Sequence, residues 1–196
     1  MLVGGAELAQ IDRGTVEEVR ASGIVSNTSC CHAFDQCADG MISGDGAGFL
    51  LLKRYEDAVR DGDHIYGCIL SSAMNGNGAR SGNPTAPSAE AEAEVVRRAW
   101  ETADLTSDDI TEIEAHGTGT IVGDPIEAES IQRCMTGNHR EHPLYVSALK
   151  SNVGHLGNMA GFAALVKVLT GFEHHVCYPI AGLQTLNPAI SAEGVE

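Results

Sequence analysis

The stretch EAHGTGTIVGDPIEAESIQRCM, residues 114–135, identifies the fold class of this chain because it joins the end of a strand to the start of a helix. The preceding apolar pattern predicts a strand over residues 110–116, ending at His116. Asp124 is the predicted N-cap of a helix over residues 124–135, and a proline in the first turn supports that start. A strand followed by a glycine-rich loop and a helix is typical of α/β proteins.

The loop between this strand and this helix carries groups suited to holding a ligand. Gly117 and Gly119 let the backbone approach a ligand closely, and the hydroxyl groups of Thr118 and Thr120 reach the same space. Ligands of α/β sheets bind beyond the carboxyl ends of strands, where His116 is expected. The alternative is a capped turn in which the histidine only satisfies local hydrogen bonds.

A second stretch, SALKSNVGHLGNMAG at residues 147–161, places Lys150 and His155 on either side of a short loop. The loop lies between a predicted strand (144–150) and a largely apolar predicted helix (159–172). A lysine at the end of an apolar strand requires a charged or polar partner when it is buried. A lysine beside a histidine lowers the pKa of the imidazole, and two neutral imidazoles can donate hydrogen bonds to one carbonyl oxygen. The alternative is a solvated Lys150 and a His155 that caps the helix.

The remaining pattern alternates strands and helices, which favours an α/β fold with one sheet covered on both faces. The run AGFLLLKR (47–54) is expected to be a strand buried on both faces. The other predicted elements are strands at residues 1–5 and 65–74 and helices at residues 55–63 and 88–103.

The composition fits a globular protein and argues against several functional classes. The chain has 196 residues, of which 43% are hydrophobic and 20% charged, so disorder is not expected. Its net charge is −15 and no basic stripe is present, which argues against a nucleic-acid partner. No apolar run approaches the roughly 18 residues that indicate a membrane span, and the start, MLVGGAELAQ, is not typical of a signal peptide. We therefore expect neither a nucleic-acid nor a membrane partner.

Six cysteines are present, and three of them, Cys30, Cys31 and Cys37, lie in the stretch SNTSCCHAFDQCADG (26–40). Adjacent cysteines chelate a single tetrahedral zinc ion poorly, and no second pair follows at CxxC spacing, so no metal site is expected. A nucleophilic cysteine needs a base or a helix N-terminus, and this stretch does not predict such a helix. We interpret the cysteines as free thiols of a reduced, cytoplasmic protein.

The two loop stretches together resemble the β-ketoacyl synthase family, the condensing domains of polyketide and fatty acid synthases. The sequences EAHGTGTIVGDPIEA and ALKSNVGHLGNMAGFAALVKVL match the family, and so do their order and separation. MLVGGAEL, NGNG (75–78) and TAPS (85–88) also resemble family motifs, as does CHAFDQCADGMISGDGAGFLLLKR, with Asp45 where glutamate is usual. The pattern is closer to polyketide synthase domains than to discrete fatty acid enzymes.

This resemblance implies a thiolase-like α/β fold of layered α/β/α/β/α type, which is built from two similar halves and is usually a homodimer. The chain is expected to hold an incomplete version of this fold. Residues 1–63 match the end of the N-terminal half, and residues 64–196 match most of the C-terminal half, truncated, within one domain overall.

The family catalyses a decarboxylative Claisen condensation of an acyl and a malonyl thioester. By resemblance, His116 and His155 are the histidines that assist loss of carbon dioxide and stabilise the enolate, and Lys150 holds their network together. Thr118 and Thr120 match positions that hydrogen-bond the phosphopantetheine arm. The resemblance thus implies no directly bound cofactor, substrates carried on phosphopantetheine, and an acyl carrier protein as partner.

The chain departs from the family pattern at both ends. The family's nucleophilic cysteine lies upstream of the strand that MLVGG matches, so no nucleophile is assigned in this chain, and neither Cys30 nor Cys31 takes that role. The family's later GFGGTNAH-like strand is also absent. We expect a partial ketosynthase that does not condense acyl chains alone and that acts as a homodimer or with a complementing ketosynthase segment. The alternatives are a non-catalytic interaction or complementation module and a malonyl-thioester decarboxylase of the thiolase superfamily.

Overall fold

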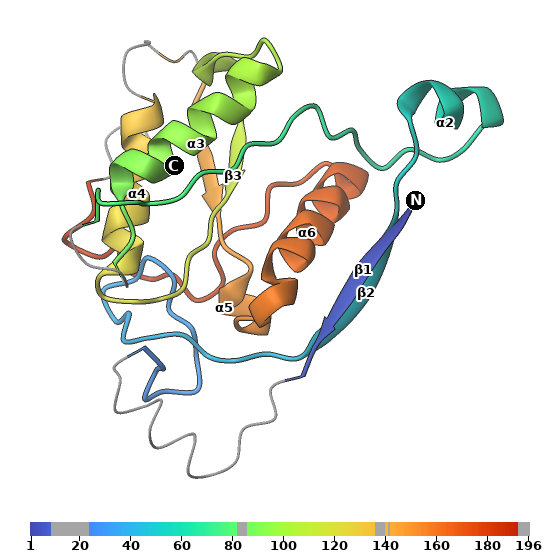
Figure 1. The fold of residues 1–196 in the computed structure, drawn as a ribbon. Helices are drawn as coiled ribbons and strands as arrows, with labels where there is room; N and C mark the ends of the chain where they lie inside the picture. The colour runs from blue at the N-terminus through green and yellow to red at the C-terminus, as the bar shows by residue number, and fades with distance from the viewer. Residues whose placement is uncertain (9–23, 82–85, 136–139, 141, 192–196) are drawn as a thin grey trace.

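A computed structural model describes residues 1–8, 24–81, 86–135, 140 and 142–191 (Figure 1). Helices and strands follow one another along the chain, as expected for an α/β protein. The described strands are β1 (Leu2–Glu7), β2 (Gly46–Leu51), β3 (Glu112–Glu114) and β4 (Tyr145–Ser147). The described helices are α2 (Tyr55–Asp61), α3 (Ala89–Thr102), α4 (Gly123–Met135), α5 (Lys150–Val153) and α6 (Ala160–His174), with short 3₁₀ helices η1 (Ser107–Asp109) and η2 (Gly157–Met159).

The strands form two small sheets that alternate with helices in layers. Figure 1 shows α3 and α4 side by side, then β3 and β4, then α6, and then β1 and β2. The β3–β4 pair is parallel, with Ile113 opposite Val146, and the β1–β2 pair is antiparallel, with Leu2 opposite Leu51. The prediction of one sheet covered on both faces is therefore wrong for the described residues, whereas an α/β/α/β order of layers is present.

The main hydrophobic core lies between α3, α4 and one face of the β3–β4 pair. Trp100 of α3 and Ile131 of α4 are buried there, and Leu144, just before β4, is fully buried. Ile113 and Val146 pack against this cluster from the two strands. Burial of such large apolar side chains fixes β3 against the two helices and so fixes the direction in which its C-terminal end points.

Helix α6 occupies the middle of the molecule and packs against the β1–β2 pair (Figure 1). A Cβ atom at Gly48 of β2 would lie 2.6 Å from the ring of Phe162 in α6, so a glycine is required where the strand and the helix approach most closely. The predicted apolar helix is thus confirmed, and its apolar character follows from its place between two sheets.

The outer face of the β1–β2 pair is apolar and open to solvent. Leu2, Phe49 and Leu51 are 67%, 71% and 76% exposed. The expectation that residues 47–54 form a strand buried on both faces is therefore wrong, because α6 covers one face and no element among the described residues covers the other.

Residues 65–74, predicted to be a strand, are extended but belong to no sheet. Their backbone groups make no ladder with a described strand, and Ile69 and Leu70 are largely exposed. The segment is held by its polar side chains instead, because the Ser71 hydroxyl donates to the carbonyl oxygen of Ala99 in α3. An apolar run predicts a strand only when a neighbouring strand can pair with it.

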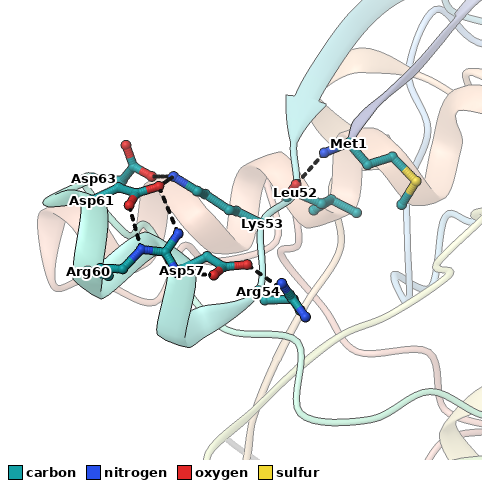
Figure 2. Close-up of polar contacts among 8 residues, drawn as sticks. All are labelled: Met1, Leu52, Lys53, Arg54, Asp57, Arg60, Asp61 and Asp63. Atoms are coloured by element: carbon teal, nitrogen blue, oxygen red, sulfur yellow. Dashed lines mark hydrogen bonds and ion pairs between the residues drawn. The ribbon is translucent and has the colours of Figure 1, made fainter.

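Helix α2 lies at the edge of the molecule, where charged side chains bind one another (Figure 2). The Lys53 ammonium contacts the carboxylates of Asp61 at 2.6 Å and Asp63 at 2.5 Å. Gly62 ends the helix in the left-handed conformation, as predicted for residues 55–63. These ion pairs are partly exposed, so they order the helix end without contributing much to stability. None of the helices in the described part of the chain is long and apolar enough to cross a membrane.

A buried carboxylate, Asp35, joins the segment at residues 33–37 to residues 184–187. Its oxygens accept the backbone N–H groups of Gln184 at 2.8 Å, Thr185 at 3.0 Å and Cys37 at 2.8 Å. Burial alone would raise the pKa of Asp35, but the three N–H donors outweigh it and lower the pKa to about 2.

We predict that Asp35→Asn lowers the free energy of unfolding at pH 7 by about 1–3 kcal/mol, because the amide cannot accept all three N–H groups. At pH values above 3.8, the ordinary pKa of the carboxyl group, the ionised Asp35 contributes fully to the free energy of unfolding. This contribution is lost as the pH falls toward 2. The difference between the two proteins should therefore shrink in acid. Urea denaturation at several pH values measures it, and equal stabilities at pH 7 would contradict the prediction.

Candidate active site

The loop that follows β3 begins with His116 and is held by a carboxylate from α4. Glu127 accepts the backbone N–H of His116 at 2.5 Å through one oxygen and that of Gly117 at 2.8 Å through the other. Because both oxygens are used, the backbone of the histidine is fixed relative to the helix. Sequence reasoning missed Glu127, whose only signal was its place in the first turns of the helix after the loop.

A second buried carboxylate, Asp124, holds the same loop from the other side. It is 0% exposed and accepts the backbone N–H of Gly119 at 3.1 Å and that of Phe34 at 2.6 Å. The prediction that Asp124 is the N-cap of its helix is wrong, because α4 already begins at Gly123. The hydroxyl of Thr120 accepts the Gly123 N–H at 3.1 Å instead, which leaves the carboxylate free to reach the loop.

The two predicted threonines lie together on this loop. The hydroxyl oxygens of Thr118 and Thr120 are 3.0 Å apart, and both side chains are partly open to solvent. Beneath them, the Cys31 thiol donates to the carbonyl oxygen of Thr118 at 3.3 Å. Both hydroxyls thus lie on the loop that begins with His116, close to the start of α4 at Gly123.

Lys150 is buried against the histidine of the loop. Its residue is 7% exposed, and its Nζ lies 3.2 Å from His116 Nδ1 and also donates to the His116 carbonyl oxygen. The residue is the first of α5 rather than the last of a strand, because β4 ends at Ser147. The predicted need for a polar partner is met by His116 itself, so the alternative of a solvated lysine is wrong.

His155 comes to the same place from the loop between α5 and α6. Its ring lies 5.5 Å from the His116 ring, centroid to centroid, in an edge-to-face arrangement. The backbone N–H of Gly157 donates to His155 Nδ1 at 2.9 Å, and the backbone N–H of His155 donates to the carbonyl oxygen of Ile42 at 2.6 Å. The structure thus brings His116, Lys150 and His155 together from three elements.

The environment of the two imidazoles favours their neutral forms over their charged forms. Although His116 remains open to solvent on one side, the protein packed around its ring lowers its pKa to about 4, with the positive charge of Lys150 adding to the effect. Burial lowers the pKa of His155 too, again with a contribution from Lys150. The pKa of Lys150 is lowered by burial, while the carboxylate of Glu127 opposes that shift.

The hydrogen bonds fix which ring nitrogen of each imidazole carries its proton. An ammonium group and a backbone N–H can only donate, so Nδ1 of His116 and Nδ1 of His155 are acceptors. Each neutral ring therefore carries its proton on Nε2. Two N–H donors on adjacent rings can stabilise negative charge that develops on one oxygen of a bound substrate.

The cysteines of this region are not arranged for nucleophilic or metal chemistry. Burial raises the pKa of the Cys31 thiol to about 11, with the charge of Asp124 adding to the shift, which is the opposite of thiolate activation. Cys30 is exposed, and all six cysteines are free thiols. Over the residues with described positions, no group of three or more His, Cys, Asp or Glu side chains could hold a metal ion.

Comparison with protein families places both parts of the chain in one family. Residues 66–184 match the model of the β-ketoacyl synthase C-terminal domain. Residues 1–58 match the model of the β-ketoacyl synthase N-terminal domain. The first match alone covers more than half of the chain, so the resemblance seen in the two loop stretches is confirmed.

Relatives of this chain include polyketide synthases. The chain is 44% identical over 176 residues to methylphloroacetophenone synthase of Cladonia uncialis, a match that covers 90% of this chain and 7% of that protein. It is 40% identical over 192 residues to highly reducing polyketide synthase 19 of Pyricularia oryzae, covering 98% of this chain and 7% of that protein. The chain thus spans less than a tenth of the length of these relatives.

Solved ketosynthases share the fold of this chain. The ketosynthase from module 6 of the Bacillus subtilis bacillaene synthase matches with a TM-score of 0.90 and 36% identity, over 97% of this chain and 34% of that chain. An oxazolomycin ketosynthase domain of Streptomyces albus matches with a TM-score of 0.91 and 32% identity, over 98% and 34%. The predicted thiolase-like α/β fold is confirmed, as is the prediction that only part of such a domain is present.

We predict that Lys150→Met raises the pKa of His116 by about one unit from its value near 4, because a positive charge next to the ring is lost. Because folding lowers the pKa of His116, the folded state loses stability as the pH falls from 6.5 toward 4. In the variant the pKa of the folded state is closer to 6.5, so this loss of stability should occur over a narrower pH range. NMR titration of the imidazole protons measures the pKa. Lys53→Met, which removes an exposed lysine at the edge of the molecule, is the control and should leave the pKa of His116 unchanged. An unchanged pKa of His116 in Lys150→Met would contradict the prediction, because it would show that the lysine charge does not contribute.

Proposed function

The chain belongs to the β-ketoacyl synthase family, and we propose that its histidine pair performs the decarboxylation step of a polyketide ketosynthase. The observation that carries this proposal is the pair of neutral imidazoles, His116 and His155, each with Nδ1 already bonded and Nε2–H free to donate. Burial of the two rings favours this neutral state, and the positive charge of Lys150 adds to the effect.

The proposed reaction starts from a malonyl thioester whose carbonyl oxygen accepts hydrogen bonds from the two Nε2–H groups. The bond between the α-carbon and the carboxylate breaks, carbon dioxide leaves, and the electron pair forms the enolate of the remaining thioester. The negative charge then lies on the oxygen that the two imidazoles already contact, so they stabilise the transition state more than the substrate. In the complete domain, the enolate carbon attacks the acyl thioester, and the new carbon–carbon bond displaces the cysteine thiolate.

Substrate delivery and acylation are assigned to groups outside this histidine pair. We propose that Thr118 and Thr120 hydrogen-bond the phosphopantetheine arm of an acyl carrier protein, since both hydroxyls lie together on the loop that begins with His116 and both residues are partly exposed. The nucleophilic cysteine is not one of the residues of this chain, and the raised pKa of Cys31 supports that assignment. The six free thiols favour a reducing compartment, and we propose the cytoplasm.

The exposed apolar face of the β1–β2 pair favours a further role in assembly. We propose that other residues of a ketosynthase domain cover Leu2, Phe49 and Leu51, because solved ketosynthases match this chain over only about a third of their length. Large apolar side chains that line an open strand pair are typical of surfaces that another segment buries. The chain would then contribute the decarboxylation half of the site to a larger ketosynthase.

We predict that the chain releases carbon dioxide from a malonyl thioester, and that His116→Ala and His155→Ala each reduce this rate by at least about 100-fold, because each removes one donor from the developing enolate oxygen. His174→Ala, at the exposed end of α6, is the matched control and should leave the rate unchanged. Release of carbon dioxide and formation of the acetyl thioester are both measured.

Two results would contradict the proposal. One is decarboxylation that is as fast in His116→Ala as in the unaltered chain, which would remove the histidine from the reaction. The other is formation of a β-ketoacyl product by the chain without any added ketosynthase segment, because that product requires an acylated cysteine that we do not assign here. Condensation that starts only when a segment carrying the nucleophile is supplied supports both the decarboxylation and the assembly role.

A further inference from the structure

A buried ion pair lies close to the site but outside the groups that contact substrate in the proposed reaction. Lys167 of α6 and Glu114 of β3 are 2.6 Å apart, and their side chains are only 8% and 6% exposed. Removing two charges from water is costly, and such a pair is retained only where its geometry is good and further hydrogen bonds satisfy the carboxylate.

The carboxylate of Glu114 has those further hydrogen bonds, and they lead toward the site. One oxygen accepts the backbone N–H of Leu149 at 2.6 Å, and the other accepts the Ser147 hydroxyl at 2.6 Å in addition to Lys167. Leu149 immediately precedes Lys150, so the carboxylate fixes the backbone from which the buried lysine side chain extends.

The three elements that meet at Glu114 are the three that carry the histidine–lysine site. β3 continues into His116, the Ser147–Leu149 turn continues into Lys150, and α6 follows the loop that holds His155. We propose that Glu114 and Lys167 form a positioning pair that holds Lys150 against His116. This role deepens the proposed function and rests on it, because it concerns the groups that this function uses.

A neighbouring glutamate on the same strand provides an internal comparison. Glu112 lies two residues before Glu114, on the same face of β3, and also accepts a hydrogen bond from Ser147, at 3.0 Å. It makes no bond to the Leu149 N–H among the described contacts. A general effect of removing charge from this strand should therefore appear with Glu112 as well, whereas a positioning effect should appear only with Glu114.

Loss of the Glu114 charge should displace Lys150 from His116. In Glu114→Gln the Lys167 ammonium is left without its counter-charge, and the neutral amide holds the Leu149 N–H less strongly. The groups that face His116 are Lys150, His155 and Glu127. Of these, Lys150 is the one that directly follows the Leu149 N–H bound by Glu114, so withdrawal of the lysine should be visible as a rise in the pKa of His116.

The test is an NMR titration of His116 in the full chain carrying Glu114→Gln, with Glu112→Gln as the matched control and Lys150→Met as the upper limit. We expect Glu114→Gln to raise the pKa of His116 by about half a unit or more, without exceeding the shift in Lys150→Met. Glu112→Gln should leave it unchanged. If Glu114→Gln does not fold, the double variant Glu114→Gln/Lys167→Met, which leaves no unpaired buried ammonium, takes its place with the same expectation.

An unchanged His116 titration in the folded Glu114 variant, or equal shifts in the Glu112 and Glu114 variants, would overturn the positioning role. The titration requires no turnover, so this failure is separate from failure of the proposed function. If the chain decarboxylates but the pKa of His116 is unchanged in Glu114→Gln, only the positioning role is contradicted. If the pKa of His116 rises in Glu114→Gln but the unaltered chain does not decarboxylate, only the proposed function is contradicted.

Discussion

The burial of one ammonium group, that of Lys150, is the interaction on which the rest of the site depends. A lysine that is 7% exposed needs acceptors, and His116 supplies two of them, its carbonyl oxygen and Nδ1. The same contact assigns the proton of the imidazole to Nε2, and the lysine charge adds to the burial that lowers the pKa of the ring. A single buried charge thus determines the tautomer of its neighbour and favours its neutral form.

Around this lysine, carboxylates hold the loops in place beside the buried apolar cluster that contains Phe34 and Ala148. Glu127 and Asp124, both from α4, accept backbone N–H groups of the loop that begins with His116. Burial raises the pKa of both carboxyl groups, while the N–H donors lower it. Gly117 and Gly119 are buried but have no side chains to pack, so charge-assisted hydrogen bonds from their backbone N–H groups to the carboxylates fix the loop.

The sequence predicted the residues that the structure brings together at the site better than the residues that hold them in place. His116, Lys150 and His155 stand at the ends of predicted strands and loops, and their spacing resembles that of a known family. Glu127 and Glu114 gave no such signal, because a glutamate in a helix or at a strand end is usually solvated. The wrong predictions of a doubly buried strand at residues 47–54 and of a paired strand at residues 65–74 have a different cause. An apolar run does not indicate whether another strand or helix lies beside it, because pairing depends on the whole molecule.

The carboxylate of Asp124 also determines how this region can move. One of its oxygens holds the loop at Gly119 and the other holds Phe34, which lies 85 positions earlier in the chain and adopts a left-handed backbone conformation with φ of 60°. The two segments therefore share one anchor in α4, and displacing either of them stretches its own hydrogen bond to Asp124. Each bond restricts the backbone of its segment, so the conformational entropy of the region is lower than that of two unanchored loops.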